Sequence, residues 1–269
     1  KAGRLIARVP MIVAGGDRIR NGHDPLPADE RLSHAGNFLW QLTGRVPDEE
    51  TAKDLDTALV LHADHSFNAS TFACREVAST RAHMYASVAA GVGALSGSLH
   101  GGANARVMKM LDALKNEKDI PGWVRKELDG GRKIMGMGHA VYKTCDPRAR
   151  FLKDMCFRLG RKLGQEHWCG LSTQIEEAAL AEFGKRGKTT IKPNVDFYSA
   201  AVYHMMGMPG DLMTPVFAVA RVAGWTAHVI EEKFGDAQEK PALYRPSSEY
   251  IGNYCGKTGC VYQPMEKRK

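Results

Sequence analysis

Apolar positions along this chain recur at the three-to-four-residue spacing of amphipathic helices, and the alternation typical of strands is scarce. In residues 48–61, Ala52, Leu55 and Leu59 repeat behind an acidic first turn, as expected at the start of a helix. The same periodicity predicts six further helices, at residues 70–95, 104–114, 148–164, 171–183, 197–206 and 211–234. We therefore expect an all-α fold.

Two glycine-containing breaks divide this helical pattern. They lie at Gly101-Gly102 and at residues 207–209, and glycines at such positions are typical of hinges. We expect a smaller helical domain over residues 104–207, inserted into a larger one formed by residues 1–103 and 208–269. The tail from Gly235 is rich in Pro, Gly and Tyr, which predicts an irregular arm that packs on a partner.

The composition is that of an ordinary soluble globular protein. Of the 269 residues, 43% are hydrophobic and 25% are charged, and no apolar run approaches the roughly 20 residues that span a bilayer. Residues 1–19 contain too short an apolar stretch for a secretory signal, and the chain starts without Met, as a processed or partial product would. We expect a cytoplasmic location.

Charge and cysteine spacing narrow the classes of function. The net charge of +7 comes from scattered Lys and Arg, which fits either a mildly basic surface or a field that attracts anionic substrates. The sequence lacks a basic stretch interleaved with aromatic residues, so it does not favour nucleic-acid binding. The six cysteines form no C-x-x-C pair, so we expect reduced thiols. Cys255 and Cys260 flank a glycine-rich turn, and a disulfide bridge or a metal site there is an alternative.

Three side chains suited to proton transfer lie at backbone breaks. His100 precedes Gly101-Gly102 and a predicted helix, so it is either a helix cap or a neutral hydrogen-bond donor to a carbonyl. Asp196 precedes another helix and is either its N-cap or a general base whose pKa is raised by desolvation. His139 follows glycines that let backbone approach a ligand. Together these groups suit proton removal next to a carbonyl.

Arginines and a histidine pair complete the candidates. Arg148 begins a predicted helix, and Arg221 lies in an apolar helix, where an arginine needs an anionic partner. Arg245 precedes Pro246 and is compatible with simple surface exposure. The segment His62-Ala63-Asp64-His65 lacks the H-E-x-x-H pattern, so we expect no metal there, and a metallohydrolase stays only an alternative.

Five segments, in this order, resemble the citrate synthase family. They are residues 62–72, 99–104, 138–143 with 146–148, 193–198 and 214–225. The resemblance runs from about residue 8 to residue 250 and implies a citrate synthase-like, two-domain, all-helical enzyme of the tricarboxylic acid cycle that works as a homodimer and closes over its substrates. Because the family's N-terminal helices are absent, we expect the chain to start within the large domain and to leave apolar surface exposed.

The resemblance implies a Claisen-type condensation of acetyl-CoA with oxaloacetate, followed by hydrolysis of citryl-CoA. Asp196 would take the methyl proton, His100 would donate a hydrogen bond to the thioester oxygen, and His139 would protonate the ketone oxygen. The residues implied to bind oxaloacetate or line its pocket are His65, Asn68, Arg148, Phe217, Arg221 and Arg245. In the family the counterpart of Arg245 enters the neighbouring subunit's site, so a monomer is expected to be inactive.

Coenzyme A is implied as part of the co-substrate, and no permanently bound cofactor is expected. The positions implied to lie along it are Ile134, Met135, Gly136, Met137, Gly138, Lys192 and Asn194. One alternative is a 2-methylcitrate synthase that uses propionyl-CoA on the same residues, because one methylene is worth only about 1–3 kcal/mol. Another is a truncated paralogue that binds without turnover. We expect neither nucleic acid nor a membrane as partner.

Overall fold

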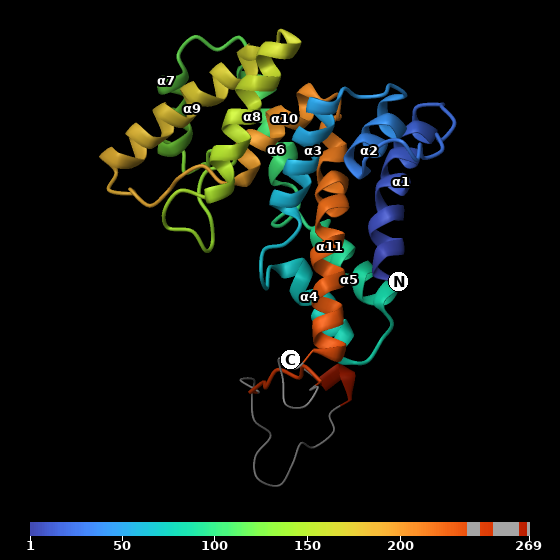
Figure 1. The fold of residues 1–269 in the computed structure, drawn as a ribbon. Coiled ribbons are helices and arrows are strands. Elements are labelled where there is room, and N and C mark those ends of the chain that lie inside the picture. Colours follow the sequence, from blue (N-terminus) through green and yellow to red (C-terminus); the bar gives the residue numbers. More distant parts are fainter. Residues whose placement is uncertain (236–242, 250–263, 268–269) are drawn as a thin grey trace.

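The computed structural model describes residues 1–235, 243–249 and 264–267, and the regular structure within them is helical. The helices are α1 (Ala2–Arg20), α2 (His34–Thr43), α3 (Glu49–His62), α4 (Ala69–Ser79), α5 (Met84–Leu95), α6 (Ala103–Leu114), α7 (Ile120–Asp129), α8 (Pro147–Leu163), α9 (Glu166–Lys185), α10 (Val195–Met205) and α11 (Met213–Phe234), with 3₁₀ turns η1 (Gly210–Leu212) and η2 (Met265–Lys267). The predicted all-α class is confirmed (Figure 1).

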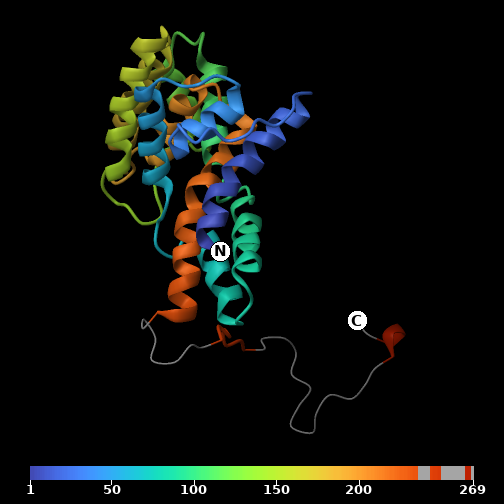
Figure 2. The ribbon, with the colours of Figure 1, turned by 45° about the vertical axis from the view of Figure 1, so that its right-hand side comes forward.

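The helices form two groups that meet at one junction. Helices α6 to α10 pack on one another at one end of the molecule, whereas α1, α4, α5 and α11 form an elongated bundle (Figures 1 and 2). One apolar core runs from α1–α3 into α6–α10, and a smaller one lies around Trp225 between α4, α5 and α11. Because α3 contacts α8 and α11 contacts α6, loops from both groups converge at this junction.

Most of the predicted helices are present close to their predicted bounds. The pattern at residues 48–61 forms α3, where Asp48 caps the helix by accepting a hydrogen bond from Thr51 N at 3.0 Å. The pattern at residues 148–164 forms α8, which ends at Gly164 in the left-handed conformation that favours glycine. Local periodicity and capping residues therefore decide these elements.

The single helix predicted over residues 70–95 is wrong, because the chain turns back there. It forms α4 and α5, and the intervening Arg81 has a left-handed φ of +66°. His83 then starts the second helix by accepting a hydrogen bond from Ala86 N at 3.1 Å. Small residues let this hairpin close, since a Cβ on Gly91 would clash with Cys74 Sγ.

The sequence pattern did not predict α1, α2 or α7. Helix α1 contains Pro10 and the pair Gly15-Gly16, which lower helix propensity, yet it packs against α2 and α11. Tertiary packing therefore supplies the stability that local propensity withholds. The two shorter helices begin at N-caps, Ser33 and Asp119, that the periodicity alone does not reveal.

The expectation that all six cysteines are reduced thiols is wrong for one pair. Cys156 on α8 and Cys169 on α9 are joined in a disulfide. The antiparallel hairpin of these two helices brings the residues together although they are 13 positions apart, a proximity that their spacing does not signal. Cys74 and Cys145 are free thiols, and Cys255 and Cys260 lie outside the described residues.

Over the residues that the structure describes, no helix is both long enough and apolar enough to cross a bilayer.

Candidate active site

The loop between α3 and α4 holds His65 at the junction of the two helix groups. Ser66 has a left-handed φ of +49°, and its backbone N–H donates to Asp64 Oδ2 at 3.1 Å. Asn68 ends the loop as the N-cap of α4 and accepts from Thr71 N at 3.2 Å. The loop is thus fixed at both ends, which places the His65 ring 5.0 Å from the ring of His139.

His139 lies in the connection between α7 and α8 and faces His65 and Tyr142. Its Nδ1 accepts hydrogen bonds from Val141 N at 3.0 Å and Tyr142 N at 3.2 Å, so the proton of the neutral ring resides on Nε2. Burial lowers the pKa of His139, and the positive charge that His65 carries when protonated, together with that of Arg148, lowers it further. His139 is therefore suited to donate from Nε2 as a neutral group.

Asp146 anchors Arg148 and was not singled out from the sequence. Burial raises the pKa of Asp146, but its hydrogen bonds with Arg148 lower it overall, and the Nη2–Oδ2 distance is 2.8 Å. The same carboxylate caps α8 and accepts from Val195 N, the first residue of α10, at 3.1 Å. Asp146 thus joins the starts of two helices, and its place before Pro147 was the only signal in the sequence.

Asp196 lies in the first turn of α10, but it is not the N-cap. Asn194 has that role and accepts from Asp196 N at 3.0 Å. Burial raises the pKa of Asp196 from 3.8 to about 6, although the positive charge of Arg148 opposes the shift. Within the described part of the chain no hydrogen bond occupies its carboxylate. It is therefore free to accept a proton.

The ring of His100 contacts the first turn of α4 and not the helix that follows it. Ser70 N donates to His100 Nε2 at 3.2 Å, and Ser70 Oγ lies 2.8 Å from the same nitrogen. Burial lowers the pKa of His100, and the charge of Arg221 adds to this. Because Nε2 accepts a hydrogen bond, the neutral ring carries its proton on Nδ1, where it remains available for donation.

Arg221 is a buried cation on α11 that contacts the end of α3. Its Nε donates to the carbonyl oxygen of His62 at 2.8 Å, and its guanidinium carbon lies 4.7 Å from the ring centre of Phe217. Burial lowers the pKa of Arg221 to about 10, so it remains charged at neutral pH. No carboxylate forms an ion pair with Arg221 among the described residues, so the guanidinium is available to an anionic ligand.

The two guanidinium groups connect the proton-transfer residues electrostatically. Arg148 affects the pKa values of His65, His139 and Asp196, and Arg221 affects those of His65, His100 and Asp196. The candidates thus share one positively charged region, although no hydrogen bond in the described ranges joins His100, His139 and Asp196 directly. Arg245 is not part of it: this exposed residue follows Tyr244, which lies against α4 and α11.

The loop at residues 134–138 pairs with the segment that precedes α10. Gly138 N donates to Lys192 O at 2.8 Å, and Asn194 N donates to Gly136 O at 2.9 Å. Gly136 and Gly138 have positive φ values, and a Cβ at Gly136 would clash with Phe197. The residues that we assigned to coenzyme A therefore form one backbone-paired unit.

This unit borders a cavity of about 670 Å³. Its lining is basic at Arg132, Lys133, Arg186 and Lys188 and apolar around Ile134, and it includes His139 at one edge. Met137 and Gly138 line it, whereas Lys192 and Asn194 hydrogen-bond to the loop without bordering this cavity. Met135 borders a separate recess of about 450 Å³. Cations beside apolar surface suit a ligand that carries phosphates on an organic body.

His62 and His65 lie in different surroundings, because His62 ends α3 whereas His65 lies in the loop that follows. His62 is fully buried, and its Nδ1 donates to Ala58 O at 2.8 Å while its ring lies against Phe217. No group of three His, Cys, Asp or Glu side chains suited to a metal ion is found in the part of the chain described here.

Comparison with known proteins shows the family to which this chain belongs. A family model described as the C-terminal domain of citrate synthase matches residues 1–247. The citrate synthase of Haloferax volcanii is 46% identical over 94% of this chain and 64% of its own length. Citrate synthase 2 of Bacillus subtilis is 43% identical, covering 100% of this chain and 68% of its own length. The chain belongs to the citrate synthase family.

Solved structures agree with that assignment. Citrate synthase from Pyrobaculum aerophilum superposes with a TM-score of 0.87 at 37% identity, covering 99% of this chain and 64% of that one. A citrate synthase from Thermoplasma acidophilum, solved as a ternary complex with carboxymethyl coenzyme A and oxaloacetate, superposes with a TM-score of 0.86 at 34% identity, covering 99% of this chain and 68% of that one. A 2-methylcitrate synthase of Corynebacterium glutamicum is 37% identical over 98% of the chain. The chain spans just under two thirds of several of these relatives.

Proposed function

We propose that this chain carries the catalytic groups of a citrate synthase. The observation that carries the proposal is the combination of a half-buried carboxylate at Asp196, which accepts no hydrogen bond within the described residues, with two imidazoles whose hydrogen bonds leave one N–H each for donation. A methyl group next to a thioester is a weak acid, so a base of raised pKa and a donor to the developing enolate oxygen both lower the barrier.

The reaction then proceeds in three steps. Asp196 removes a methyl proton from acetyl-CoA, while His100 Nδ1–H donates a hydrogen bond to the thioester oxygen of the resulting enolate. The enolate carbon attacks the ketone carbon of oxaloacetate and the thioester carbonyl is restored, while His139 Nε2–H supplies the proton that converts the ketone oxygen to a hydroxyl. Water then adds to the thioester carbon of citryl-CoA, the carbon–sulfur bond breaks, and coenzyme A leaves as the thiol.

The remaining predicted site residues orient the substrates. Arg148, Arg221 and His65 would pair with the oxaloacetate carboxylates, and Asn68 and Phe217 would line the same pocket. The 134–138 loop with Lys192 and Asn194 would hold coenzyme A along the basic cavity. The ternary complex of the Thermoplasma relative with oxaloacetate and a coenzyme A derivative supports this choice of ligands.

Release of coenzyme A thiol tests the activity. We expect the purified chain to release thiol from acetyl-CoA only when oxaloacetate is present, with citrate as the product by mass spectrometry. Propionyl-CoA should give a kcat/KM lower by about tenfold or more, because the site would discriminate one methylene. A preference for propionyl-CoA would identify a 2-methylcitrate synthase. Thiol release without oxaloacetate, or binding without turnover, would refute the proposal.

We also propose the two-domain division expected from the sequence, with residues 104–207 as the smaller domain. Helices α6 to α10 pack chiefly on one another, which supports this division. Gly207, at a φ of +84°, and the glycines at 101 and 102 lie where the chain passes between the groups. Motion about them would close the site and exclude water during condensation. The cytoplasmic location stays a prediction.

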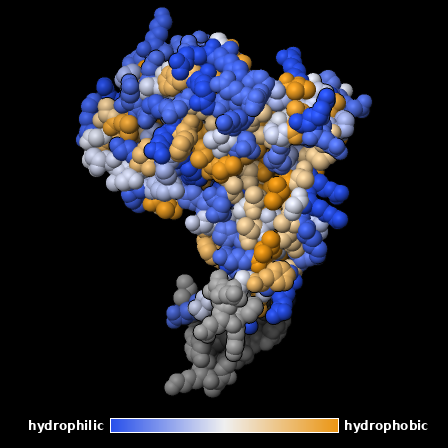
Figure 3. All heavy atoms as spheres, in the orientation of Figure 1, coloured by the Kyte–Doolittle hydropathy of each residue, from blue (hydrophilic) through white to orange (hydrophobic). Residues whose placement is uncertain are grey.

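A homodimer in which Arg245 completes the partner's site is part of the proposal. Tyr85 and Val92 are exposed on α5, and Figure 3 shows apolar residues gathered over the elongated bundle.

We expect Asp196→Asn and Arg245→Leu homodimers to be nearly inactive, whereas co-expression of the two variants restores about a quarter of wild-type activity. Half of the dimers then contain one subunit of each variant. Each of these mixed dimers has one intact site, in which Asp196 of one subunit is combined with Arg245 of the other. If Arg245 served its own subunit, mixing would restore nothing.

A further inference from the structure

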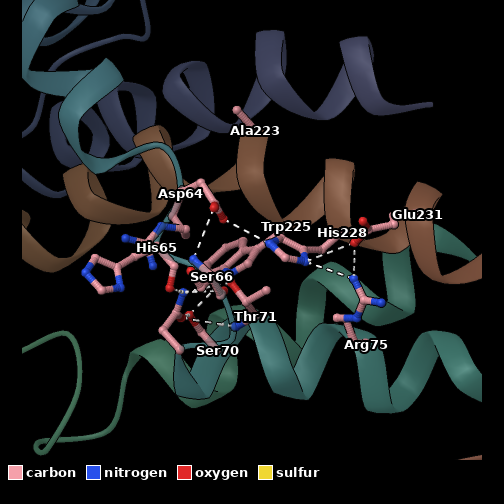
Figure 4. Close-up of polar contacts among 12 residues, drawn as sticks. Asp64, His65, Ser66, Ser70, Thr71, Arg75, Ala223, Trp225, His228 and Glu231 are labelled. Carbon is pink, nitrogen blue, oxygen red and sulfur yellow. Dashed lines mark hydrogen bonds and ion pairs between the residues drawn. The ribbon is translucent and has the colours of Figure 1, made fainter. Parts of the chain in front are cut away.

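A polar cluster outside the catalytic groups links the His65 loop to the segment that carries Arg245. It consists of Asp64, Arg75, His228, Glu232 and Tyr244, contributed by the loop after α3, by α4, by α11 and by the described segment 243–249. Figure 4 shows the part of this cluster around His228. None of these residues is among the predicted site residues, and we define them together as the loop-anchoring cluster.

His228 is the link between the loop and α4. Arginine only donates, so Arg75 Nη1, 3.0 Å away, donates to His228 Nδ1. The proton of the neutral ring is then on Nε2, which donates to Asp64 Oδ1 at 3.1 Å (Figure 4). The other Asp64 oxygen accepts from the backbone N–H of Ser66. One ordered series of donors therefore runs from a buried arginine to the turn beside His65.

The loop needs this support because its backbone conformation is unfavourable. Ser66 has a left-handed φ, which a residue with a side chain adopts only when its surroundings stabilise it. The loop also packs directly on α11, since Gly224 N donates to Ala63 O at 3.1 Å and a Cβ at Gly224 would clash with that oxygen. The Asp64–His228 bond is the side-chain counterpart of this backbone contact.

The second end of the cluster holds the segment before Arg245. Arg75 is 3% exposed and pairs with the fully buried Glu232 at 2.7 Å. Tyr244 donates from its hydroxyl to Glu232 Oε2 at 2.6 Å, its backbone N–H donates to Ser79 Oγ, and its ring stacks on Phe72. Because a buried ion pair requires well-placed partners, Arg75 is the shared support of both ends.

We propose that the loop-anchoring cluster is a positioning device for the substrate site. His228 and Asp64 hold His65 in place, and Arg75, Glu232 and Tyr244 hold the segment from which Arg245 extends. The assignment of His65 and Arg245 to oxaloacetate rests on the proposed function, whereas the anchoring of the two segments does not.

Two matched substitutions of His228 test the catalytic consequence. Leucine fills similar volume without hydrogen bonds, whereas glutamine can accept from Arg75 and donate to Asp64. We expect H228L to raise KM for oxaloacetate about tenfold, with KM for acetyl-CoA within about twofold and kcat within about threefold. H228Q should restore KM. The control V229A removes buried volume from the next residue of α11 and should leave KM unchanged.

Hydrogen exchange tests the anchoring without using activity. In H228L we expect exchange at residues 62–70 to accelerate about tenfold while residues 243–249 stay protected, and in Y244F the reverse. Arg75→Lys should loosen both segments. Unchanged exchange in H228L and Y244F would overturn the proposal, as would an equal KM in H228L and V229A. If the wild-type chain shows no condensation but the exchange pattern holds, the proposed function fails and the anchoring stands.

Discussion

Replacing Asp196 by asparagine is expected to lower kcat for condensation about a thousandfold while oxaloacetate still binds. The asparagine keeps the size and position of the side chain in the first turn of α10 but cannot accept the methyl proton. Positioned general bases contribute about 10²–10⁴-fold, and a weak carbon acid places this base in the upper half of that range. Steady-state thiol release measures kcat, and calorimetry with oxaloacetate measures binding.

The same substitution is expected to stabilise the fold at neutral pH. The pKa of Asp196 in the folded chain is about 6, above its ordinary 3.8, because burial disfavours the charged form. The folded state therefore binds this proton more tightly, and the associated stability is present below pH 3.8 and is lost as the pH rises through 6. At pH 7 the ionised carboxylate costs about 3 kcal/mol, which asparagine removes.

A pH series separates this effect from a general gain in stability. The difference in unfolding free energy between Asp196→Asn and the wild type should shrink as the pH falls from 7 towards 4. The control Asp112→Asn changes an exposed carboxylate that pairs with Lys115 on the surface, and it should alter neither kcat nor the pH dependence. Near-normal turnover in Asp196→Asn would exclude this residue as the base.

The sequence predicted elements whose stability is encoded locally. Helix α3 has an acidic first turn, a capping Asp48 and an apolar period, so its pattern is sufficient. Helix α1 has Pro10 and two glycines where such signals should be, and it exists because α2 and α11 cover it. The break between α4 and α5 depends on a left-handed Arg81, which no residue preference predicts.

The candidate site likewise contains residues that local motifs point to and residues whose roles depend on the fold. Motifs at loops singled out His100, His139 and Asp196 as candidates, since functional groups beside Gly and Pro stand out from a helical background. Asp146, Ser70 and the Cys156–Cys169 bridge did not stand out, because their roles arise only when segments distant in sequence meet. The N-cap interpretation of Asp196 was wrong because Asn194, two residues earlier, has the free oxygen in the right place.

Replacing His100 by alanine is expected to lower kcat about 10²–10³-fold, the typical cost of losing one donor to a developing oxyanion. The donor is the Nδ1–H, because Ser70 N–H donates to Nε2 and thereby fixes the tautomer. The hydroxyl of Ser70 in turn accepts from Trp225 Nε1 at 3.1 Å, which holds Ser70 in position. Single-turnover thiol release measures the loss, and the exposed His34→Ala is the control.

The Ser70 contact also predicts how the rate depends on pH. Protonating His100 would place an N–H against the N–H of Ser70, at a helix start where positive charge is already disfavoured. Because burial and then Arg221 lower the pKa of His100, the ring stays neutral at pH 7. Activity should therefore fall on acidification, since both Asp196 and His100 become protonated. A rate that rises below pH 6 would mean that an imidazolium is the donor, and this tautomer-based role for His100 would be wrong.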